Sequence, residues 1–191
     1  MHRFIYKKAI RCLGIAESFI RKIGEKSILA GVVMRSDLII DGFSFAKITV
    51  GGMDATQGVL KLFKRLKRKD INVLMINGCV ISWYNVIDLP YVYETLKVPL
   101  ICITYEESEG LEPYFRKYFK DAEKRIKIYK KNGERERIKL KTGYEVFVRY
   151  FGLNKREVSL ILNKFTLNGS IPEPLRVAKL LARSILRNLK D

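Results

Sequence analysis

Residues 53–70, with the sequence MDATQGVLKLFKRLKRKD, mark the point where the spacing of apolar residues along the chain changes. Val59, Phe63 and Leu66 recur at intervals of four and three, which is typical of one face of an amphipathic helix. Asp54 and Gln57 have the spacing of a capping box, so we expect Asp54 to cap the start of this helix. The other face is basic and holds Lys61, Lys64, Arg65 and Arg68.

The segments before this helix have the pattern of strands. Residues 10–16 form a short apolar run, and residues 27–50 contain two further stretches rich in Val, Ile and Phe, with polar breaks at Ser36-Asp37 and Asp41-Gly42. We expect these three strands to form an antiparallel meander.

The segments after the helix indicate parallel strands. Residues 71–76 (INVLMI) and 99–104 (PLICIT) are near-continuous apolar runs, as found in strands buried on both faces. Asp88 and Pro90 indicate the start of a short helix between them, which ends near Lys97. The order of elements predicts an α/β fold with a mixed sheet, in which three antiparallel strands precede parallel strands and helices flank the sheet.

The remaining residues predict a helical C-terminal part. After Gly110 we expect one helix through about residue 131, then a polar linker over 131–143 and a strand in TGYEVFVRYFG. Asn154 caps the next predicted helix and Pro172 opens the last one. We expect a single domain over residues 1–191, with a core of about 1–130 and a C-terminal helical part of about 144–191.

The net charge indicates a polyanionic partner. The chain has 37 Lys and Arg against 20 Asp and Glu, a formal net charge of +17. The stretch FRKYFKDAEKRIKIYKK interleaves basic and aromatic residues, the mixture that single-stranded nucleic acid binding uses. A solvated, thermophile-like surface, an acidic protein or an anionic membrane would also fit this charge. On the last helix basic residues form one stripe, made up of Arg176, Lys179, Arg183, Arg187 and Lys190.

Composition excludes several other classes. The three cysteines lack metal-ligand spacing and sit among apolar neighbours, so we expect buried thiols in a reducing compartment. His2 is the sole histidine and lies near the end of the chain, which argues against histidine-dependent hydrolysis. Charges interrupt the first twenty residues, so we expect neither a signal peptide nor a membrane span, and a cytoplasmic protein.

Four blocks of this sequence resemble an archaeal family of uncharacterised proteins, domain-of-unknown-function family ninety-nine. They are GIAES at 14–18, ITVGGMDATQ at 48–57, the pair Asn77-Gly78 followed by NVID at 85–88, and IPEPLRVA at 171–178. That family is similar to endonuclease V, which implies an RNase H-like fold. Enzymes of that fold hold Mg²⁺ with carboxylates from the first strand, the first helix and the end of the fourth strand.

This chain departs from the pattern that the resemblance implies. The family pattern has acidic residues where this chain has Ala16, Gly51, Gln57 and Asn77, and a histidine where it has Lys179. Four neutral side chains leave a divalent cation with few ligands, so we expect no metal and no cofactor. A rearranged site would have to use Glu17, Asp54 and Asp88, although strand alternation directs Glu17 away from the face of residue 16. Mg²⁺ enters only in that case.

A cleft at the end of the fourth strand remains. Gly78 leaves the backbone open there, and Trp83 and Tyr84 follow at the edge where open α/β sheets bind ligands. These two aromatics either stack bases, fill the space that a metal left, or pack on the C-terminal helix.

We therefore expect a nucleic-acid-binding protein of endonuclease-V-like ancestry with a degenerate nuclease site, and leave open whether it is an enzyme and whether it binds DNA or RNA. An active Mg²⁺-dependent phosphodiesterase with substituted ligands, and an interaction protein that binds no nucleic acid, are the alternatives. The expected contacts are Lys61, Arg65, Arg68, Trp83, Tyr84, Arg176, Lys179, Arg183 and Arg187.

Overall fold

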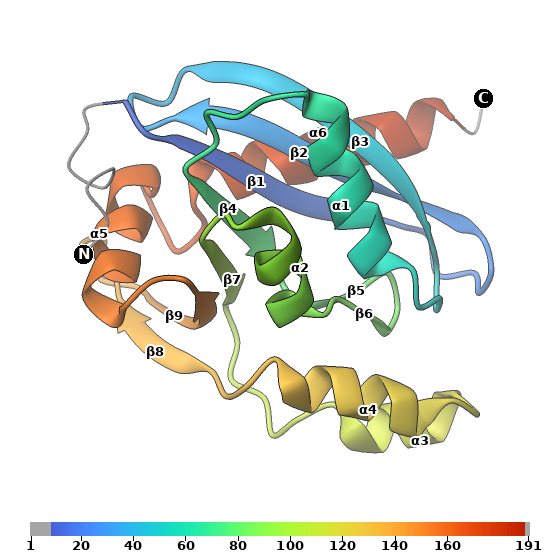
Figure 1. The fold of residues 1–191 in the computed structure, drawn as a ribbon. Helices are drawn as coiled ribbons and strands as arrows, with labels where there is room; N and C mark the ends of the chain where they lie inside the picture. Colours follow the sequence, from blue (N-terminus) through green and yellow to red (C-terminus); the bar gives the residue numbers. More distant parts are fainter. Residues whose placement is uncertain (1–8, 190–191) are drawn as a thin grey trace.

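The computed structural model describes residues 9–189 and contains a seven-stranded mixed sheet with helices on both faces (Figure 1). His2 and Lys190 lie outside these residues. The order of strands in the sheet is β3-β2-β1-β4-β7-β9-β8, and β5 and β6 form a separate two-stranded ribbon. The elements are β1 (Arg11–Ser18), β2 (Lys26–Arg35), β3 (Ile40–Thr49), α1 (Ala55–Leu66), β4 (Val73–Asn77), β5 (Val80–Ile81), β6 (Asn85–Val86), α2 (Leu89–Leu96), β7 (Leu100–Thr104), α3 (Glu112–Tyr118), α4 (Ala122–Lys131), β8 (Glu136–Lys139), β9 (Glu145–Phe151), α5 (Lys155–Phe165) and α6 (Glu173–Asn188).

The strand pairing confirms the predicted α/β architecture. β1, β2 and β3 form the antiparallel meander, β1 pairs with β4 in parallel, and β4 pairs with β7 in parallel. β1, β4 and β7 therefore end on the same side of the sheet, at Ser18, Asn77 and Thr104. We call this side the carboxyl edge.

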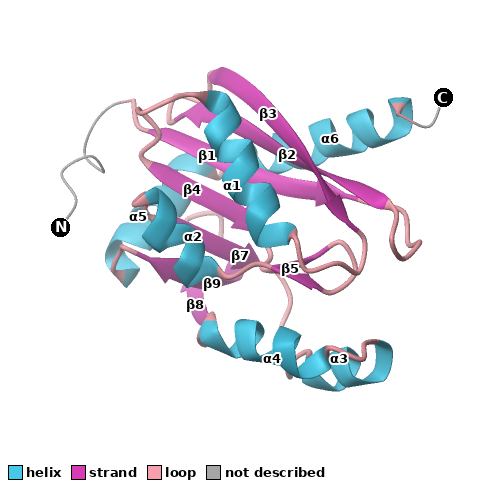
Figure 2. Cartoon of the chain, turned by 45° about the vertical axis from the view of Figure 1, so that its right-hand side comes forward, coloured by secondary structure: helices cyan, strands magenta, loops and turns pink. Residues whose placement is uncertain are grey.

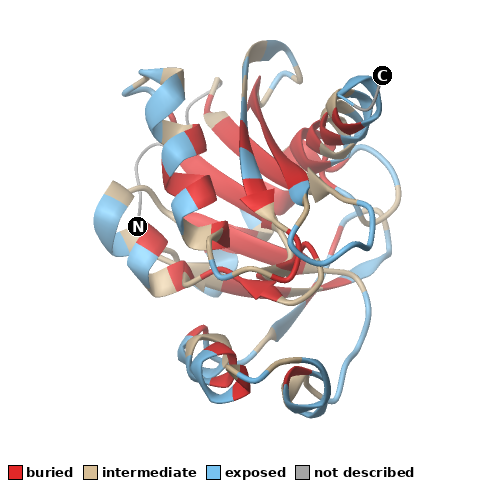
Figure 3. Cartoon of the chain, turned by 90° about the vertical axis from the view of Figure 1, so that its right-hand side faces the viewer, coloured by how far each residue is buried: buried red, intermediate tan, exposed pale blue. Residues whose placement is uncertain are grey.

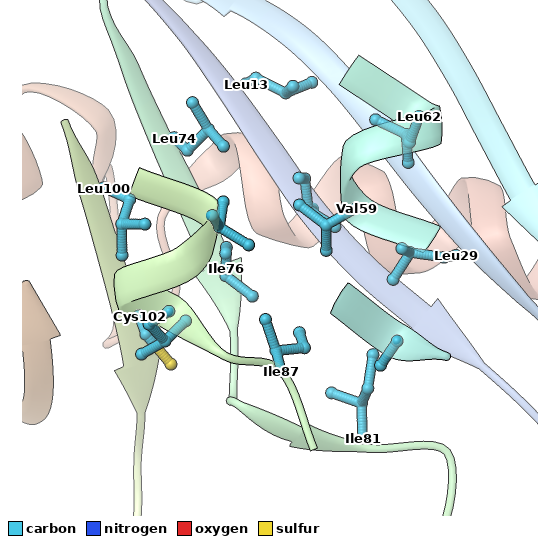
Figure 4. Packing of buried hydrophobic residues seen from close by; sticks show 14 of the residues in the cluster. Leu13, Leu29, Val59, Leu62, Leu74, Ile76, Ile81, Ile87, Leu100 and Cys102 are labelled. Atoms are coloured by element: carbon cyan, nitrogen blue, oxygen red, sulfur yellow. The ribbon is translucent and has the colours of Figure 1, made fainter. Parts of the chain in front are cut away.

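Helices cover the two faces of the sheet in separate layers (Figure 2). One cluster of buried residues joins α1 and α2 to the sheet, and Figure 4 shows its members Leu13, Val59, Leu62 and Ile76 packed together. On the opposite face α5 packs over β7 and β9 and α6 packs over β1 and β2. Gly14 allows α6 to lie close to β1, because a Cβ at that position would come 2.5 Å from the backbone of Pro174.

Several sequence predictions hold and three are wrong. Asp88 and Asn154 cap α2 and α5, the latter through a complete capping box, and Pro172 precedes α6. Asp54 stands before α1, but its side chain makes no cap hydrogen bond.

The predicted helix after Gly110 is two helices, because Phe119 is extended between α3 and α4. The predicted linker contains strand β8, which pairs with β9 and completes the sheet. No helix among residues 9–189 is long and apolar enough to cross a membrane.

Candidate nucleic-acid interface at the carboxyl edge

The turn between β5 and β6 is the most unusual piece of backbone at the carboxyl edge. Ser82, Trp83 and Tyr84 have φ values of 44°, 55° and 67°, so three consecutive residues with side chains adopt the left-handed conformation. That conformation costs an L-residue about 1–2 kcal/mol. A turn of this kind persists only where its surroundings hold it, and such turns cluster at functional sites.

Arg125 of α4 is the main group that holds this turn. Its guanidinium is buried, with 3% of the residue exposed, and donates hydrogen bonds of 2.8 Å to the carbonyls of Gly51, Gly52 and Tyr84. The same guanidinium pairs with Asp121 and lies 3.8 Å from the centre of the Phe119 ring. Arg125 therefore ties α4 to two turns of the carboxyl edge. The charged stretch 115–131 is thus only partly a solvated surface.

Two further contacts fix the turn to the strands. The hydroxyls of Ser82 and Ser27 are both buried and lie 2.6 Å apart, within hydrogen-bonding distance. The Gly51 N–H donates to the Ser82 carbonyl at 2.8 Å. Gly51 has φ +70°, and a Cβ at this position would come 3.2 Å from the Trp83 ring. The indole therefore occupies the space beside residue 51, where the resemblance implies an acidic residue.

Asp54 and Asn85 form a second polar network next to the turn. The Asp54 carboxylate accepts hydrogen bonds from the Thr49 N–H, the Thr49 hydroxyl and the Asn85 side chain. The side-chain Oδ1 of Asn85 accepts from the Ala55 N–H, so Asn85 supplies the cap of α1 that was predicted for Asp54. Burial alone would raise the pKa of Asp54, but the hydrogen bonds from Thr49 and Asn85 outweigh it and hold the pKa below its ordinary value. Asp54 is thus committed to a structural role.

Five aromatic rings surround this turn, and we call them the aromatic platform: Trp83, Tyr84, Tyr114, Tyr118 and Phe119. Tyr84 stacks on Tyr114 and on Tyr118 with interplanar angles of 14° and 25°. Trp83 contacts Tyr118 and Phe119, with ring centres 5.6 Å and 5.2 Å apart, and the Arg21 guanidinium lies 5.2 Å over the indole. Tyr114 and Tyr118 are 48% and 38% exposed. Trp83 and Tyr84 therefore pack on α3, and the C-terminal helix is not among the ring partners that the structure gives them.

The four positions where the resemblance implies acids lie in different environments. Ala16 is buried with Val32 and Ala178 beneath α6, and Gly51 is buried against Trp83. Gln57 is exposed on the first turn of α1, and Asn77 ends β4 in a half-buried position. β1 and β4 are neighbours, as expected, but they bring an alanine and an asparagine to the carboxyl edge.

The residual acids are engaged elsewhere. Glu17 receives the Lys179 ammonium, which donates to its carbonyl at 2.6 Å and lies 3.4 Å from its carboxylate. Ala16 and Glu17 thus both contact residues of α6. Strand alternation alone predicted that Glu17 would point to the opposite face of the sheet. Burial raises the pKa of Glu17, and Lys179 opposes that rise. Asp88 accepts from the Tyr91 N–H and pairs with Lys131.

These donors do not fit Mg²⁺, which requires hard anionic oxygens in an octahedral arrangement. Across residues 9–189 no group of three His, Cys, Asp or Glu side chains is placed to hold a metal ion.

The basic residues differ in how free they are. Arg68 pairs with Asp41 and Asp70 and so belongs to an ion-pair network. This network lies near the start of β1 and the end of α1, at the edge of the sheet opposite the carboxyl edge. Arg65 donates to the Phe45 carbonyl, and Lys61 is exposed. On α6 Arg176 pairs with Glu173, and Arg183 and Arg187 are exposed. The residues that α6 buries are coloured red in Figure 3.

A cavity of about 420 Å³ lies at the carboxyl edge, where β4 and β7 end. Gly78 lines it, as the cleft prediction requires, and so do Asn77, Tyr105, Arg135 and Arg149. The Tyr105 hydroxyl is buried and has no hydrogen-bond partner in the described part of the chain.

Comparison with protein families places the chain. The model of the family described as endonuclease dU matches residues 8–186. The chain belongs to the endonuclease dU family. Its similarity to an uncharacterised UPF0215 protein of Pyrobaculum aerophilum is 37% identity over 179 residues, covering 93% of this chain and 95% of that protein. A UPF0215 protein of Methanocaldococcus jannaschii is 30% identical over 184 residues, covering 95% and 97%. The archaeal resemblance drawn from the four sequence blocks is confirmed.

Solved structures confirm the RNase H-like fold of this endonuclease dU family member. A protein of unknown function from Archaeoglobus fulgidus superposes with a TM-score of 0.79 at 25% identity, covering 92% of this chain and 98% of that one. Human endonuclease V gives a TM-score of 0.65 at 13% identity, covering 100% and 92%. Endonuclease V of Ciona intestinalis, crystallised with a 24mer DNA containing an inosine followed by a ribo-adenosine, gives 0.64 at 16% identity, covering 95% and 87%.

Sequence reasoning missed two central residues of the site. Arg125 looks like any other cation of the Lys-rich α4, and its only local signal is Asp121 four positions earlier, which reads as a surface pair. Asn85 lies 31 residues from Asp54, so no local pattern links the two side chains.

Proposed function

We propose that this member of the endonuclease dU family binds single-stranded nucleic acid at the carboxyl edge and that its metal-dependent nuclease site is degenerate. The observation that carries the proposal is the aromatic platform, which a buried arginine and a strained turn hold in place at the carboxyl edge. Exposed rings in a fixed orientation are what stacking on unpaired bases requires. A platform with only a structural role would need no stacked tyrosines that are 38–48% exposed.

We propose that cationic side chains at the carboxyl edge supply the contacts to phosphate. Arg21 lies over Trp83. Arg183 follows Ala182 on α6, and Ala182 packs with Ile28 near the start of β2. Because Ile28 pairs with Ser18, this end of β2 lies at the carboxyl edge. Contacts to phosphate position a strand without reading its bases, so we propose binding with little sequence preference. The endonuclease V structure that holds DNA supports a nucleic-acid partner for this fold, and the proposal covers DNA and RNA alike.

Loss of the nuclease site is supported by what replaces the acids. Ala16 is 2% exposed in an apolar cluster with Val32 and Ala178, so that position excludes a hydrated cation as well as lacking a carboxylate. The Trp83 ring fills the space beside Gly51. Apolar groups therefore occupy both positions, so restoring one carboxylate would not restore space for a metal ion.

The binding experiment uses fluorescence anisotropy with a labelled single-stranded oligonucleotide of mixed sequence, titrated at several salt concentrations. We expect affinity to fall with salt, with a slope of about 0.7 for each phosphate neutralised. Tyr114→Ala and Tyr118→Ala each weaken binding about five-fold or more, because stacking contributes about 1–3 kcal/mol per base. The control is Tyr144→Ala, which removes an exposed tyrosine from the turn between β8 and β9. A flat salt response, or equal effects of all three variants, contradicts the proposal and favours an interaction protein.

The cleavage experiment separates binding from catalysis. Strands containing deoxyuridine, which the family description suggests, or inosine, or neither, are incubated with the protein and Mg²⁺ or Mn²⁺. We expect no cleavage. Metal-dependent cleavage that is abolished by Glu17→Ala would show that a rearranged site is active and would overturn the degenerate-site proposal.

A further inference from the structure

Two of the three buried cysteines lie together at the carboxyl edge. Cys79 follows β4 and Cys102 belongs to β7, and both lie in the same buried cluster. The Gly78 N–H, just before Cys79, donates at 2.9 Å to the carbonyl of Ile103, just after Cys102. Figure 4 shows the Cys102 side chain among the buried residues between β7 and α2. Cys79 also lines the 420 Å³ cavity. No local pattern links the two cysteines, because they are far apart in the chain and meet through the parallel pairing of β4 with β7.

Arg149 of β9 is the charged group next to this pair. It is 7% exposed, and its Nη1 donates to the Cys79 sulfur at 3.6 Å while its Nε donates to the Gly133 carbonyl at 2.6 Å. Its guanidinium also lies 5.1 Å from the centre of the Tyr129 ring. Of these contacts, the one with Cys79 is made to an ionisable atom, and a buried guanidinium strongly favours an anionic partner.

We propose that Cys79 is a reactive thiolate, that hydrogen peroxide entering the cavity oxidises it, and that Cys102 converts the product into a disulfide between β4 and β7. In the first step the sulfur attacks one peroxide oxygen, an S–O bond forms and the O–O bond breaks. Cys79 becomes a sulfenic acid, and the peroxide is reduced to hydroxide, which takes a proton from solvent to give water. In the second step the Cys102 sulfur attacks the Cys79 sulfur, the S–S bond forms and the S–O bond breaks. The Cys102 proton leaves with the sulfenic oxygen as water.

Electrostatics favour Cys79 over Cys102 as the attacking group. The hydrogen bond from Cys102 is the largest effect that lowers the pKa of Cys79, burial opposes it, and the Arg149 charge and the Asn132 side chain lower it further. The same hydrogen bond and burial raise the pKa of Cys102, which therefore keeps its proton. Burial also raises the pKa of Cys12, which lies in the core away from the cavity. Glu106 and Glu107 line the cavity as well, but both are exposed and Glu107 pairs with Arg137.

The experiment treats the full-length protein with hydrogen peroxide and follows each cysteine by mass spectrometry of peptides. In the wild type we expect a disulfide linking the peptides of Cys79 and Cys102, with Cys12 still reduced. In Cys102→Ser no resolving thiol remains, so dimedone should trap a sulfenic acid on Cys79. Cys12→Ser is the matched control, and it should oxidise like the wild type.

The charge argument has its own test. Arg149→Gln should slow peroxide oxidation of Cys79 at neutral pH by about ten-fold for each pKa unit that Arg149 contributes. Far-UV circular dichroism establishes that the variant is folded. In the wild type, which needs no folding control, the oxidation rate of Cys79 should reach half its maximum below about pH 8.5, the ordinary thiol pKa. A half-maximum above that pH, oxidation of Cys12 as fast as that of Cys79, or no dimedone adduct in folded Cys102→Ser would each overturn the proposal.

Discussion

Replacing Arg125 with glutamine tests whether the buried guanidinium holds the strained turn of the aromatic platform. Arg125 donates to three carbonyls, those of Gly51, Gly52 and Tyr84, and the shorter amide can satisfy at most one or two of them. A buried carbonyl left without a donor costs about 1–3 kcal/mol. Asp121 returns to water readily because its side chain is 36% exposed. We therefore expect the free energy of unfolding to fall by about 3–5 kcal/mol.

Two measurements separate the local effect from the global one. A loss of that size lowers the melting temperature by roughly 6–20 °C, since a chain of this length loses about 2–4 °C per kcal/mol. Trp83 is the sole tryptophan, so its fluorescence reports on the turn itself, and we expect its emission to shift to longer wavelength as the ring becomes solvated. Arg116→Gln is the matched control, because that side chain is 58% exposed and pairs only with Glu123 within the described residues. If Arg125→Gln keeps both the melting temperature and the Trp83 emission of the wild type, the turn is held by other groups.

Three further variants probe stability elsewhere in the fold. Burial raises the pKa of Glu17 in the folded state, so the folded protein binds this proton more tightly than the unfolded chain does. Between about pH 4.3 and the raised pKa, the free energy of unfolding therefore falls as the pH rises. Glu17→Gln should remove this pH dependence of the free energy of unfolding, as measured from urea unfolding curves. Equal slopes in the two proteins would contradict the shift. Ala16→Asp places a carboxylate against Val32 and Ala178 and should destabilise the protein by about 3 kcal/mol in the same assay; a stable variant that binds Mn²⁺ in calorimetry would instead show that the position still accommodates a metal ligand. Asn154→Ala removes the capping box of α5 and should cost about 1 kcal/mol, a loss that Asn168→Ala in the following connection should not reproduce.

The parts of the fold that were predictable are those with a local signal. Three such signals depend only on residues close together in the sequence. They are the change of apolar spacing before α1, the apolar runs of β4 and β7, and the cap at Asn154. β8 was missed because only Ile138 of its four residues is buried, so an edge strand with charged neighbours lacks any apolar pattern. The break between α3 and α4 was missed because Phe119 leaves the helix to contact Trp83, which comes from another part of the chain, and its ring also lies against Arg125 of α4.

The sequence predicted where the candidate site lies, but only part of its composition. The cleft prediction at Gly78 followed from the order of strands, and the neutral residues at 16 and 77 are visible in the sequence. Arg125, Asn85 and the Cys79–Cys102 pair depend on contacts across tens of residues. Periodicity cannot reveal such contacts, because each of these side chains is typical of its local segment.

The proposed replacement of acidic residues at the carboxyl edge would change how this fold meets a phosphate group. Carboxylates repel phosphate and need a divalent cation between the two, so a nuclease of this architecture depends on metal both to hold and to cleave its strand. Ala16, Gly51 and Asn77 impose no such repulsion, and Arg21 and Arg183 can approach phosphate directly. Binding by arginine releases counterions and weakens with salt but requires no metal. Removal of divalent cations with a chelator should therefore leave the affinity for the oligonucleotide unchanged at constant ionic strength. If the protein held its strand through an intact metal site, the chelator would abolish that affinity.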